Sequence, residues 1–289
     1  MKTWLLASRP KTLFAAVSPV IIGTVMAIGD GQGHWPAALA ALLGAILIQI
    51  GTNFANDYAD FFKGADTHER LGPTRVTQSK MVTPVTMRNA TILVFGLAIL
   101  VGSYLVWRGG LPVVAIGLLS IVAGLLYTAG PYPLAYIGAA DLFVLIFFGP
   151  VAVGGTYYVQ ALAITPTVLI VGLAPGLFSM AILTVNNLRD VEQDRAANKR
   201  TPVVRFGRAF ARAEYLFCMI LACLIPAILV VQGTAPAWSL LTAAVLIPAL
   251  PALRSVFVDQ GRVLNKTLAL TGQLLLLYSV LFGVGWLIG

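Results

Sequence analysis

Long apolar segments separated by short polar ones run along the whole chain. Most of them approach the ~20 residues that an α-helix needs to cross the hydrocarbon core of a bilayer. The pattern predicts nine membrane-spanning helices: Leu13–Ile28, Pro36–Asn53, Met87–Trp107, Pro112–Thr128, Ile137–Val159, Pro166–Asn186, Ala213–Val231, Trp238–Arg254 and Leu268–Ile288. We therefore expect an all-α membrane protein in which residues 1–289 form a single domain.

The composition of the chain supports this interpretation. Of its 289 residues, 58% are hydrophobic and only 10% are charged, which is too little charge to cover the surface of a soluble domain. The first apolar segment follows Lys2, Arg9 and Lys11 and lacks a convincing small-residue cleavage site. We interpret it as a retained helix and not as a signal peptide.

The basic residues predict the orientation of the chain in the bilayer. If the N-terminus is inside, eighteen of the nineteen Lys and Arg residues fall on the inner side and Arg108 alone falls outside. Four tryptophans then lie at the outer interface, namely Trp35, Trp107, Trp238 and Trp286. We expect a cytosolic N-terminus and a C-terminus across the inner membrane of the cell. The net charge of +8 is then an orientation signal, and no nucleic-acid partner is expected.

Two inner segments, Phe54–Thr86 and Asn187–Arg212, are long enough to build a site. If the helices before them continue into these segments, each presents a polar stripe along one helical face. The first stripe comprises Asn53, Asn56, Asp57 and Asp60, and the second comprises Asn186, Asp190 and Asp194. Both end an outer-to-inner helix, which suggests an internal duplication that presents two matching acidic stripes at the same depth.

Opposed carboxylates at one membrane face repel each other unless a cation lies between them. Their oxygen ligands suit Mg²⁺, which binds through a few carboxylates together with substrate phosphates. We predict that Mg²⁺ is bound by Asn56, Asp57, Asp60, Asn186, Asp190 and Asp194. Nearby basic residues could bind a diphosphate, namely Lys63, Arg75, Arg189, Lys199 and Arg205. Solvated helix ends are the simpler explanation, but two spaced stripes among only eleven acidic residues favour a functional site.

Both stripes resemble signature motifs of the UbiA-type intramembrane aromatic prenyltransferases. The motifs read Asn56-Asp57-x-x-Asp60 with Asp66, and Asn186-Asn187-x-Arg189-Asp190-x-x-x-Asp194, and the resemblance extends over the whole chain. It implies a nine-helix bundle around a central cavity that two cytosolic loops cap. It also implies Mg²⁺-promoted loss of diphosphate from a polyprenyl donor, with Asp60 and Asp190 in catalytic roles. The first motif departs from the common four-residue repeat, because Asp60 is followed by Asp66.

Within this family, three stretches resemble the members that prenylate 1,4-dihydroxy-2-naphthoate for menaquinone. They are Ser8–Thr12, Arg70–Gln78, and Tyr127–Pro133 together with Phe148–Pro150. The resemblance implies that the acceptor ring captures the prenyl carbocation and loses its carboxylate as CO₂. Members that use 4-hydroxybenzoate, homogentisate or a phytyl donor are the alternatives within the family.

Three further residues are candidates for the site. Arg9 could bind the acceptor carboxylate or, like Lys11, could anchor the chain at the interface. Tyr127 could flank the carbocation or could be an interfacial aromatic residue. Asp141 lies in a predicted span at the depth of the acidic stripes, where an ionisable side chain is a candidate catalytic residue.

A transporter is the alternative outside the enzymes, because repeats with charged residues also occur there. The ionisable residues of this chain gather at one membrane face, whereas a transport path needs polar groups at several depths. The sequence therefore favours an enzyme that takes a polyprenyl diphosphate and 1,4-dihydroxy-2-naphthoate from a lipid bilayer.

Overall fold

The computed structural model describes residues 2–63, 71–130 and 133–289, and every regular element in these ranges is helical. The elements are α1 (Lys2–Ser8), a 3₁₀ turn (Pro10–Thr12), α2 (Leu13–Gly29), α3 (Trp35–Lys63), α4 (Pro84–Gly109), α5 (Leu111–Leu126), α6 (Leu134–Ile137), α7 (Ala140–Ile146), a π-turn (Phe147–Val151), α8 (Ala152–Ala161), α9 (Pro166–Ala196), α10 (Pro202–Val231), a 3₁₀ segment (Ala237–Val245), α11 (Leu246–Val258), a 3₁₀ turn (Gly261–Val263) and α12 (Leu264–Ile288). Asp66 and Arg70 lie outside the described residues, as does the side chain of Lys63.

The predicted all-α membrane fold is confirmed. Within the described ranges, eight helical segments are long and apolar enough to cross a membrane. The predicted span Pro112–Thr128 corresponds to α5, an apolar helix of 16 residues that falls short of that length. The count of nine crossings therefore stays a prediction, and so does a central cavity.

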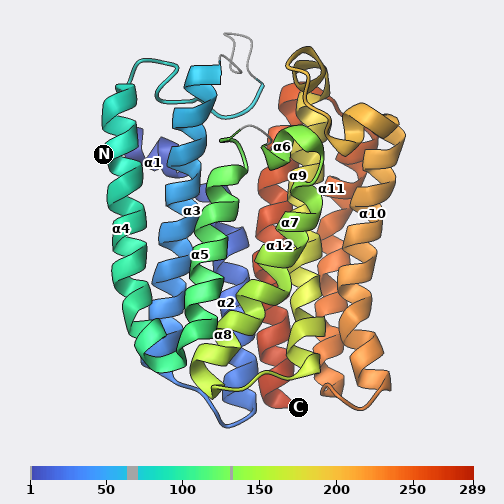
Figure 1. Ribbon diagram of the computed structural model, residues 1–289. Coiled ribbons are helices and arrows are strands. Elements are labelled where there is room, and N and C mark those ends of the chain that lie inside the picture. Colours follow the sequence, from blue (N-terminus) through green and yellow to red (C-terminus); the bar gives the residue numbers. More distant parts are fainter. Residues whose placement is uncertain (1, 64–70, 131–132) are drawn as a thin grey trace.

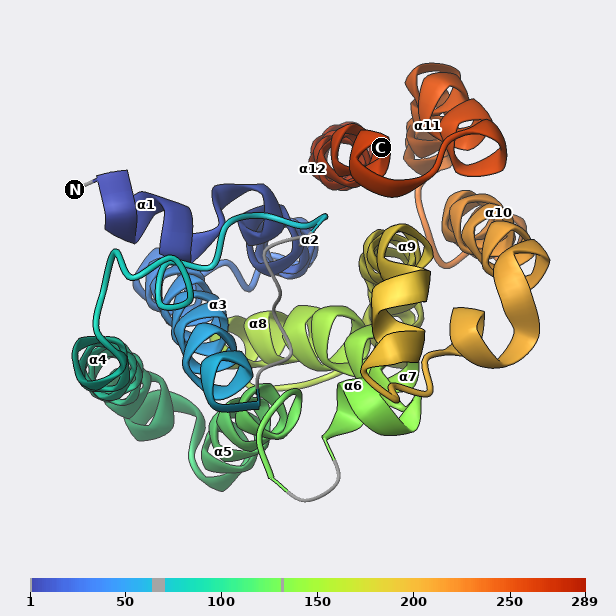
Figure 2. The ribbon, with the colours of Figure 1, turned by 90° about the horizontal axis from the view of Figure 1, so that it is seen from above.

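The helices run side by side along one common direction (Figure 1). Seen from above, α3, α4 and α5 lie on one side and α10, α11 and α12 on the other, with α2, α8 and α9 between them (Figure 2). The last turns of α3 and α9 reach the same end of the bundle, near α1, while the C-terminus lies at the opposite end (Figure 1). This arrangement brings the two acidic stripes to one face.

The second long inner segment is mostly helical. The continuation of α9 into it was expected, whereas the early start of α10 was not. Helix α9 continues to Ala196 and α10 already begins at Pro202, so only residues 197–201 connect them. Helix α10 contains a break at Gly207, whose φ of 85° and ψ of 174° are accessible to glycine but not to other residues without strain. The sequence pattern missed the start of α10, because the residues before Arg212 are polar and were assigned to a connecting segment.

A break between α7 and α8 fixes how closely α9 can pack. Pro150 interrupts the helix as expected from its missing N–H, and Gly149 has non-helical dihedrals of −110° and −114°. Gly172 of α9 packs directly against this break. A Cβ at position 172 would lie 2.8 Å from the Cα of Pro150, so a larger residue would not fit there. The contact allows α7 to lie alongside the half of α9 that carries the acidic stripe.

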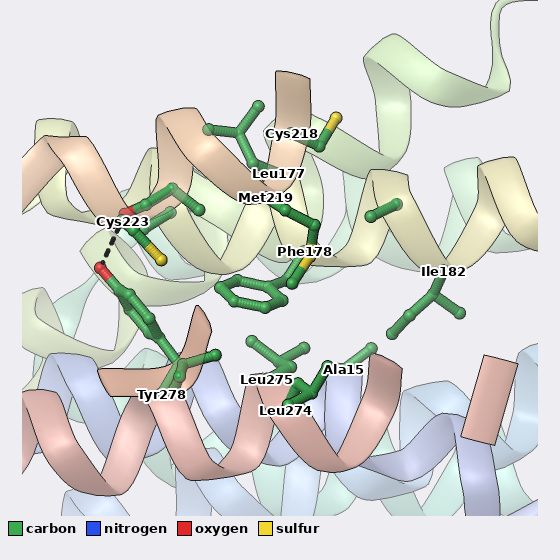
Figure 3. Close-up of a cluster of buried hydrophobic side chains, with 14 of the residues drawn as sticks. Ala15, Leu177, Phe178, Ile182, Cys218, Met219, Cys223, Leu274, Leu275 and Tyr278 are labelled. Carbon is green, nitrogen blue, oxygen red and sulfur yellow. Dashed lines mark hydrogen bonds between the residues drawn. The ribbon is translucent and has the colours of Figure 1, made fainter. Parts of the chain in front are cut away.

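Helices α9, α10 and α12 enclose the largest apolar core. Phe178 is fully buried and its ring centroid lies 5.2 Å from that of Tyr278 (Figure 3). The Tyr278 hydroxyl donates a hydrogen bond to the backbone oxygen of Ala222 at 3.1 Å, so the phenol brings no unsatisfied polar group into the core. Met219 and Leu275 fill the space around the two rings (Figure 3). This core holds the acidic half of α9 on a rigid base.

At the end of the bundle near the C-terminus, the lone predicted outer basic residue has a structural role. Arg108 donates from Nε to the backbone oxygen of Val159 at 2.6 Å and from Nη2 to that of Gln160 at 3.0 Å. It thereby caps the last carbonyl groups of α8, which a cation near a helix C-terminus stabilises.

We expect the α9–α10 connection to face the cytosol, because the basic residues gather at its end of the bundle. A cysteine at Asn198 should therefore resist an impermeant thiol reagent added to intact cells, whereas one appended after Gly289 should react. Cys218 and Cys223 are buried, so the native background should be silent. Labelling of the Asn198 position alone would reverse the orientation.

Candidate functional site

The first acidic stripe lies on the last turns of α3 and is buried by the segment that follows the helix. Asp57 accepts hydrogen bonds from the backbone N–H groups of Val76 at 3.0 Å and Thr77 at 3.1 Å. Asp60 forms an ion pair with Arg75 from the same segment. Both carboxylates therefore bind the returning chain, which folds back over the end of α3.

The two asparagines of this stripe join it to other parts of the inner face. Asn53 donates from Nδ2 to the backbone oxygen of Ser8 at 2.9 Å, and so connects α3 to α1. The Oδ1 atom of Asn56 accepts a hydrogen bond of 2.6 Å from Thr128, which follows α5. Both asparagines are buried. Helix α3 thus provides the scaffold on which α1 and the end of α5 are positioned.

The second acidic stripe is organised around Arg189. Its Nε donates to Asp190 at 2.7 Å and its Nη2 donates to Asn186 at 2.8 Å, while Nη1 donates to Oδ1 of Asn265 at 2.8 Å. Arg189 is 3% exposed. A buried guanidinium needs this degree of hydrogen bonding to offset its lost hydration, so it holds both acidic-stripe side chains in defined positions.

The last acidic residue of the stripe binds a lysine from the connection to α10. Asp194 lies 3.1 Å from Nζ of Lys199, and the same ammonium lies 5.2 Å from the ring centroid of Tyr136 in α6. Burial lowers the pKa of Lys199, but the Asp194 carboxylate and Tyr136 outweigh it, so this pKa lies above its usual value. Lys199 is therefore charged at neutral pH. Arg205, which is exposed, donates to the backbone oxygen of Ile137 at 2.8 Å.

Arg9 lies between the two stripes. Its charge interacts with Asp57 and Asp60 of the first stripe and with Arg189 of the second. Its backbone has a φ of 50° and a ψ of 70°, a left-handed conformation that costs a non-glycine residue about 1–2 kcal/mol. Within the described residues, its buried Nη2 has no hydrogen-bond partner. Strain together with an open donor is typical of a binding residue.

Tyr127 and Asp141 border the same region. Burial raises the pKa of Tyr127 above its usual range, and the charges of Asp141 and Asp194 raise it further against the opposing effect of Arg9. The phenol therefore stays neutral at physiological pH and can donate a hydrogen bond. Asp141 lies in the first turn of α7 and is 5% exposed. Tyr127 thus lies within electrostatic range of both stripes, and Asp141 lies within electrostatic range of Tyr127.

Asn265 is a site residue that the sequence did not indicate. It binds Arg189 and also donates from Nδ2 to the backbone oxygen of Leu71 at 2.8 Å, so it joins α12 to α9 and to the segment after α3. A lone asparagine at the start of an apolar helix carries no periodic signal, and the short inner segment before α12 did not suggest a site. Only the tertiary contact identifies it.

The donor chemistry of the stripes fits Mg²⁺ that is shared with a phosphorylated substrate. Among the described residues, no three His, Cys, Asp or Glu side chains converge closely enough to enclose a metal by themselves. The stripes instead offer separate carboxylates and amides, of which Asp60, Asp190 and Asp194 are each paired with a cation. Mg²⁺ usually keeps waters and takes the rest of its ligands from substrate phosphates. The individual assignments from Asn56 to Asp194 stay predictions.

The chain is similar to proteins of known function. The model of the UbiA prenyltransferase family matches residues 16–280. The chain is 35% identical to 1,4-dihydroxy-2-naphthoate octaprenyltransferase of Haemophilus influenzae, over 100% of this chain and 97% of that protein. It is 40% identical to the Escherichia coli protein of the same name, over 78% and 74%. Among solved structures, a UbiA homolog from Archaeoglobus fulgidus bound to GPP and Mg²⁺ aligns over 99% of this chain and 100% of that one, with 15% identity and a TM-score of 0.68.

Proposed function

This chain belongs to the UbiA prenyltransferase family and is a transferase, and we propose that it transfers a polyprenyl group from a polyprenyl diphosphate to 1,4-dihydroxy-2-naphthoate, with loss of diphosphate and CO₂. The product would be demethylmenaquinol, a menaquinone precursor. The observation that carries the proposal is the pair of acidic stripes at one membrane face with the open guanidinium of Arg9 between them.

The basic residues of the site would bind the donor diphosphate. Arg75, Arg189 and Lys199 each lie beside a carboxylate of the stripes, so phosphate oxygens and metal ligands would be close together. Lys63 and Arg205 complete the predicted basic set. The stripe residues Asn56, Asp57, Asp60, Asn186, Asp190 and Asp194 would hold Mg²⁺, which neutralises the charge that develops on the departing diphosphate.

Arg9 and Tyr127 would position the acceptor. A guanidinium binds a carboxylate through two parallel hydrogen bonds, so the open Nη2 of Arg9 suits the naphthoate carboxylate. The ring of Tyr127 would lie near the allylic cation, where an aromatic face stabilises positive charge. The acceptor ring then bonds to the allylic carbon, and the carboxylate leaves as CO₂ while its electron pair stays on the ring.

A direct assay tests this proposal. Purified protein in detergent receives Mg²⁺, prenyl diphosphates of several chain lengths, and dihydroxynaphthoate labelled at the carboxyl carbon. We expect one labelled CO₂ for each diphosphate released, and a product that contains the prenyl group but no carboxylate. A product that keeps its carboxylate would indicate a benzoate-type activity instead, and 4-hydroxybenzoate and homogentisate serve as the comparison acceptors.

A further inference from the structure

Asp141 differs from the other acidic residues of the inner face. Its side chain is 95% buried, since the residue is 5% exposed, yet neither Oδ atom accepts a hydrogen bond from another residue of the described chain. Taking a carboxylate out of water costs several kcal/mol unless it is paired or hydrogen-bonded. An orphaned buried carboxylate in a membrane protein therefore indicates a functional requirement.

A second carboxylate, that of Glu214, has a hydrogen-bond partner that Asp141 lacks among the described residues. Glu214 of α10 interacts electrostatically with Asp141, but it accepts a hydrogen bond of 3.0 Å from the hydroxyl of Thr184. Asp194, which like Asp141 interacts electrostatically with Tyr127, is paired with Lys199. Glu214 and Asp194 thus have partners, whereas the oxygens of Asp141 accept no hydrogen bond from another described residue.

The surroundings of Asp141 define which ligand group could bind it. Among the described residues, Tyr127, Glu214 and Cys218 interact electrostatically with Asp141, and none of these three is a cation. The guanidinium of Arg205 lies near Gly138, on the N-terminal side of Asp141, and donates to the backbone oxygen of Ile137. Leu134 and Leu183 form an apolar cluster with Ala140, the residue before Asp141. A carboxylate in such a setting matches a neutral hydrogen-bond donor on an apolar body, which describes a phenolic hydroxyl.

Arg9, in the same region, is a cation with an unpaired hydrogen-bond donor, whereas Asp141 is an anion with unpaired acceptors among the described residues. Tyr127 interacts electrostatically with both Arg9 and Asp141, so an open cationic donor and an open anionic acceptor both lie within electrostatic range of one aromatic side chain. An aromatic ring that carries a carboxylate and a hydroxyl is complementary to this pair of residues.

We propose that Asp141 accepts a hydrogen bond from a ring hydroxyl of the acceptor and takes its proton while the new carbon–carbon bond forms. This inference rests on the proposed function and names the residue that activates the acceptor. It makes Asp141 a catalytic residue that acts on the ring, separate from the groups that bind the diphosphate.

The step balances without a further reactant. Proton transfer from the 1-hydroxyl to Asp141 gives a naphtholate. Its carbon 2, which carries the carboxylate, bonds to the allylic carbon as the bond to diphosphate breaks. The resulting ketone loses its carboxylate as CO₂. The electron pair of the bond between the ring carbon and the carboxylate stays on the ring and regenerates the naphtholate. Asp141 then returns the proton, which gives the neutral diol and leaves the carboxylate ready for the next turnover.

The test compares acceptors that lack one hydroxyl. The affinities of 1-hydroxy-2-naphthoate and 4-hydroxy-2-naphthoate, measured as competitors of the diol, are determined for the full chain with Mg²⁺ and a prenyl diphosphate. In the wild-type protein, 4-hydroxy-2-naphthoate, which lacks the 1-hydroxyl, should bind at least ~10-fold more weakly than the diol, since a hydrogen bond to a charged group is lost. In Asp141→Asn this preference should disappear, and kcat for the diol should fall by ~10²-fold or more.

Matched variants separate this role from a structural one. Glu214→Gln alters the neighbouring carboxylate and should leave kcat and the hydroxyl preference unchanged. Arg9→Lys should weaken the diol and both analogues by the same factor, because all three keep the carboxylate. The KM for the prenyl diphosphate should be unchanged in Asp141→Asn, which also shows that this variant is folded.

Equal binding of all three acceptors by the wild-type protein would overturn the inference without the need for any variant. Retention of the hydroxyl preference in Asp141→Asn would do the same. If the wild-type protein does not turn over the diol at all, the proposed function itself fails, whereas normal turnover without a hydroxyl preference refutes only the role of Asp141.

Discussion

Replacing Asp190 with Asn should lower kcat/KM by at least ~10²-fold, because it removes a charged ligand that acts on the departing diphosphate. Asn has nearly the same shape as Asp and can still accept a hydrogen bond from Arg189, which binds Oδ1 at 2.7 Å. Asp190→Ala would remove the hydrogen-bond acceptor of this 3% exposed guanidinium as well as its counter-charge, which is more strongly destabilising. Asp60→Asn should lower kcat/KM by a similar factor, because Asp60 is the corresponding carboxylate of the first stripe and is likewise paired with an arginine, Arg75.

The same helix provides the control for this experiment. Glu192 is two residues from Asp190, and its side chain is 64% exposed and paired with Arg195 and Arg208 at the surface. Glu192→Gln removes one negative charge from the same turn and should leave turnover within about twofold, because exposed ion pairs contribute little. Near-normal activity in either Asp190→Asn or Asp60→Asn would contradict the model of two metal-binding stripes.

The sequence could predict the stripes because their geometry is local. Once α3 and α9 are helical, residues four apart lie on one face, so Asn56 with Asp60, and Asp190 with Asp194, follow from spacing alone. The all-α fold follows in the same way from the length of the apolar segments. Arg75 and Lys199 were also predictable as members of the site, although not their particular carboxylate partners.

What the sequence could not predict depends on contacts between distant segments. Asn265 hydrogen-bonds to Leu71, which is 194 residues away, and no pattern within either segment encodes that contact. The return of the chain onto Asp57 is equally non-local. The extension of α10 to Pro202 was missed for a different reason, because a polar amphipathic helix at a membrane surface has the same composition as a loop.

Treatment with EDTA should abolish turnover, and added Mg²⁺ should restore it. The basic side chains near the stripes, Arg75, Arg189 and Lys199, are each already paired with a carboxylate. They therefore have little free positive charge to neutralise a diphosphate that gains negative charge as it leaves, and a divalent ion shared with the stripes supplies that charge. Ca²⁺, which is larger and less strict in its geometry, should restore activity poorly.

Binding of the donor gives an independent measure of the same effect. A prenyl diphosphate titrated into the protein should bind at least ~10-fold more tightly with Mg²⁺ than with EDTA, if the metal bridges the stripes and the phosphates. In Asp190→Asn this difference should shrink, while in Glu192→Gln it should be that of the wild-type protein. Full turnover in EDTA, or donor affinity that does not respond to Mg²⁺, would mean that the paired cations alone stabilise the leaving group. The acidic stripes would then serve to position Arg75, Arg189 and Lys199 and not to bind metal.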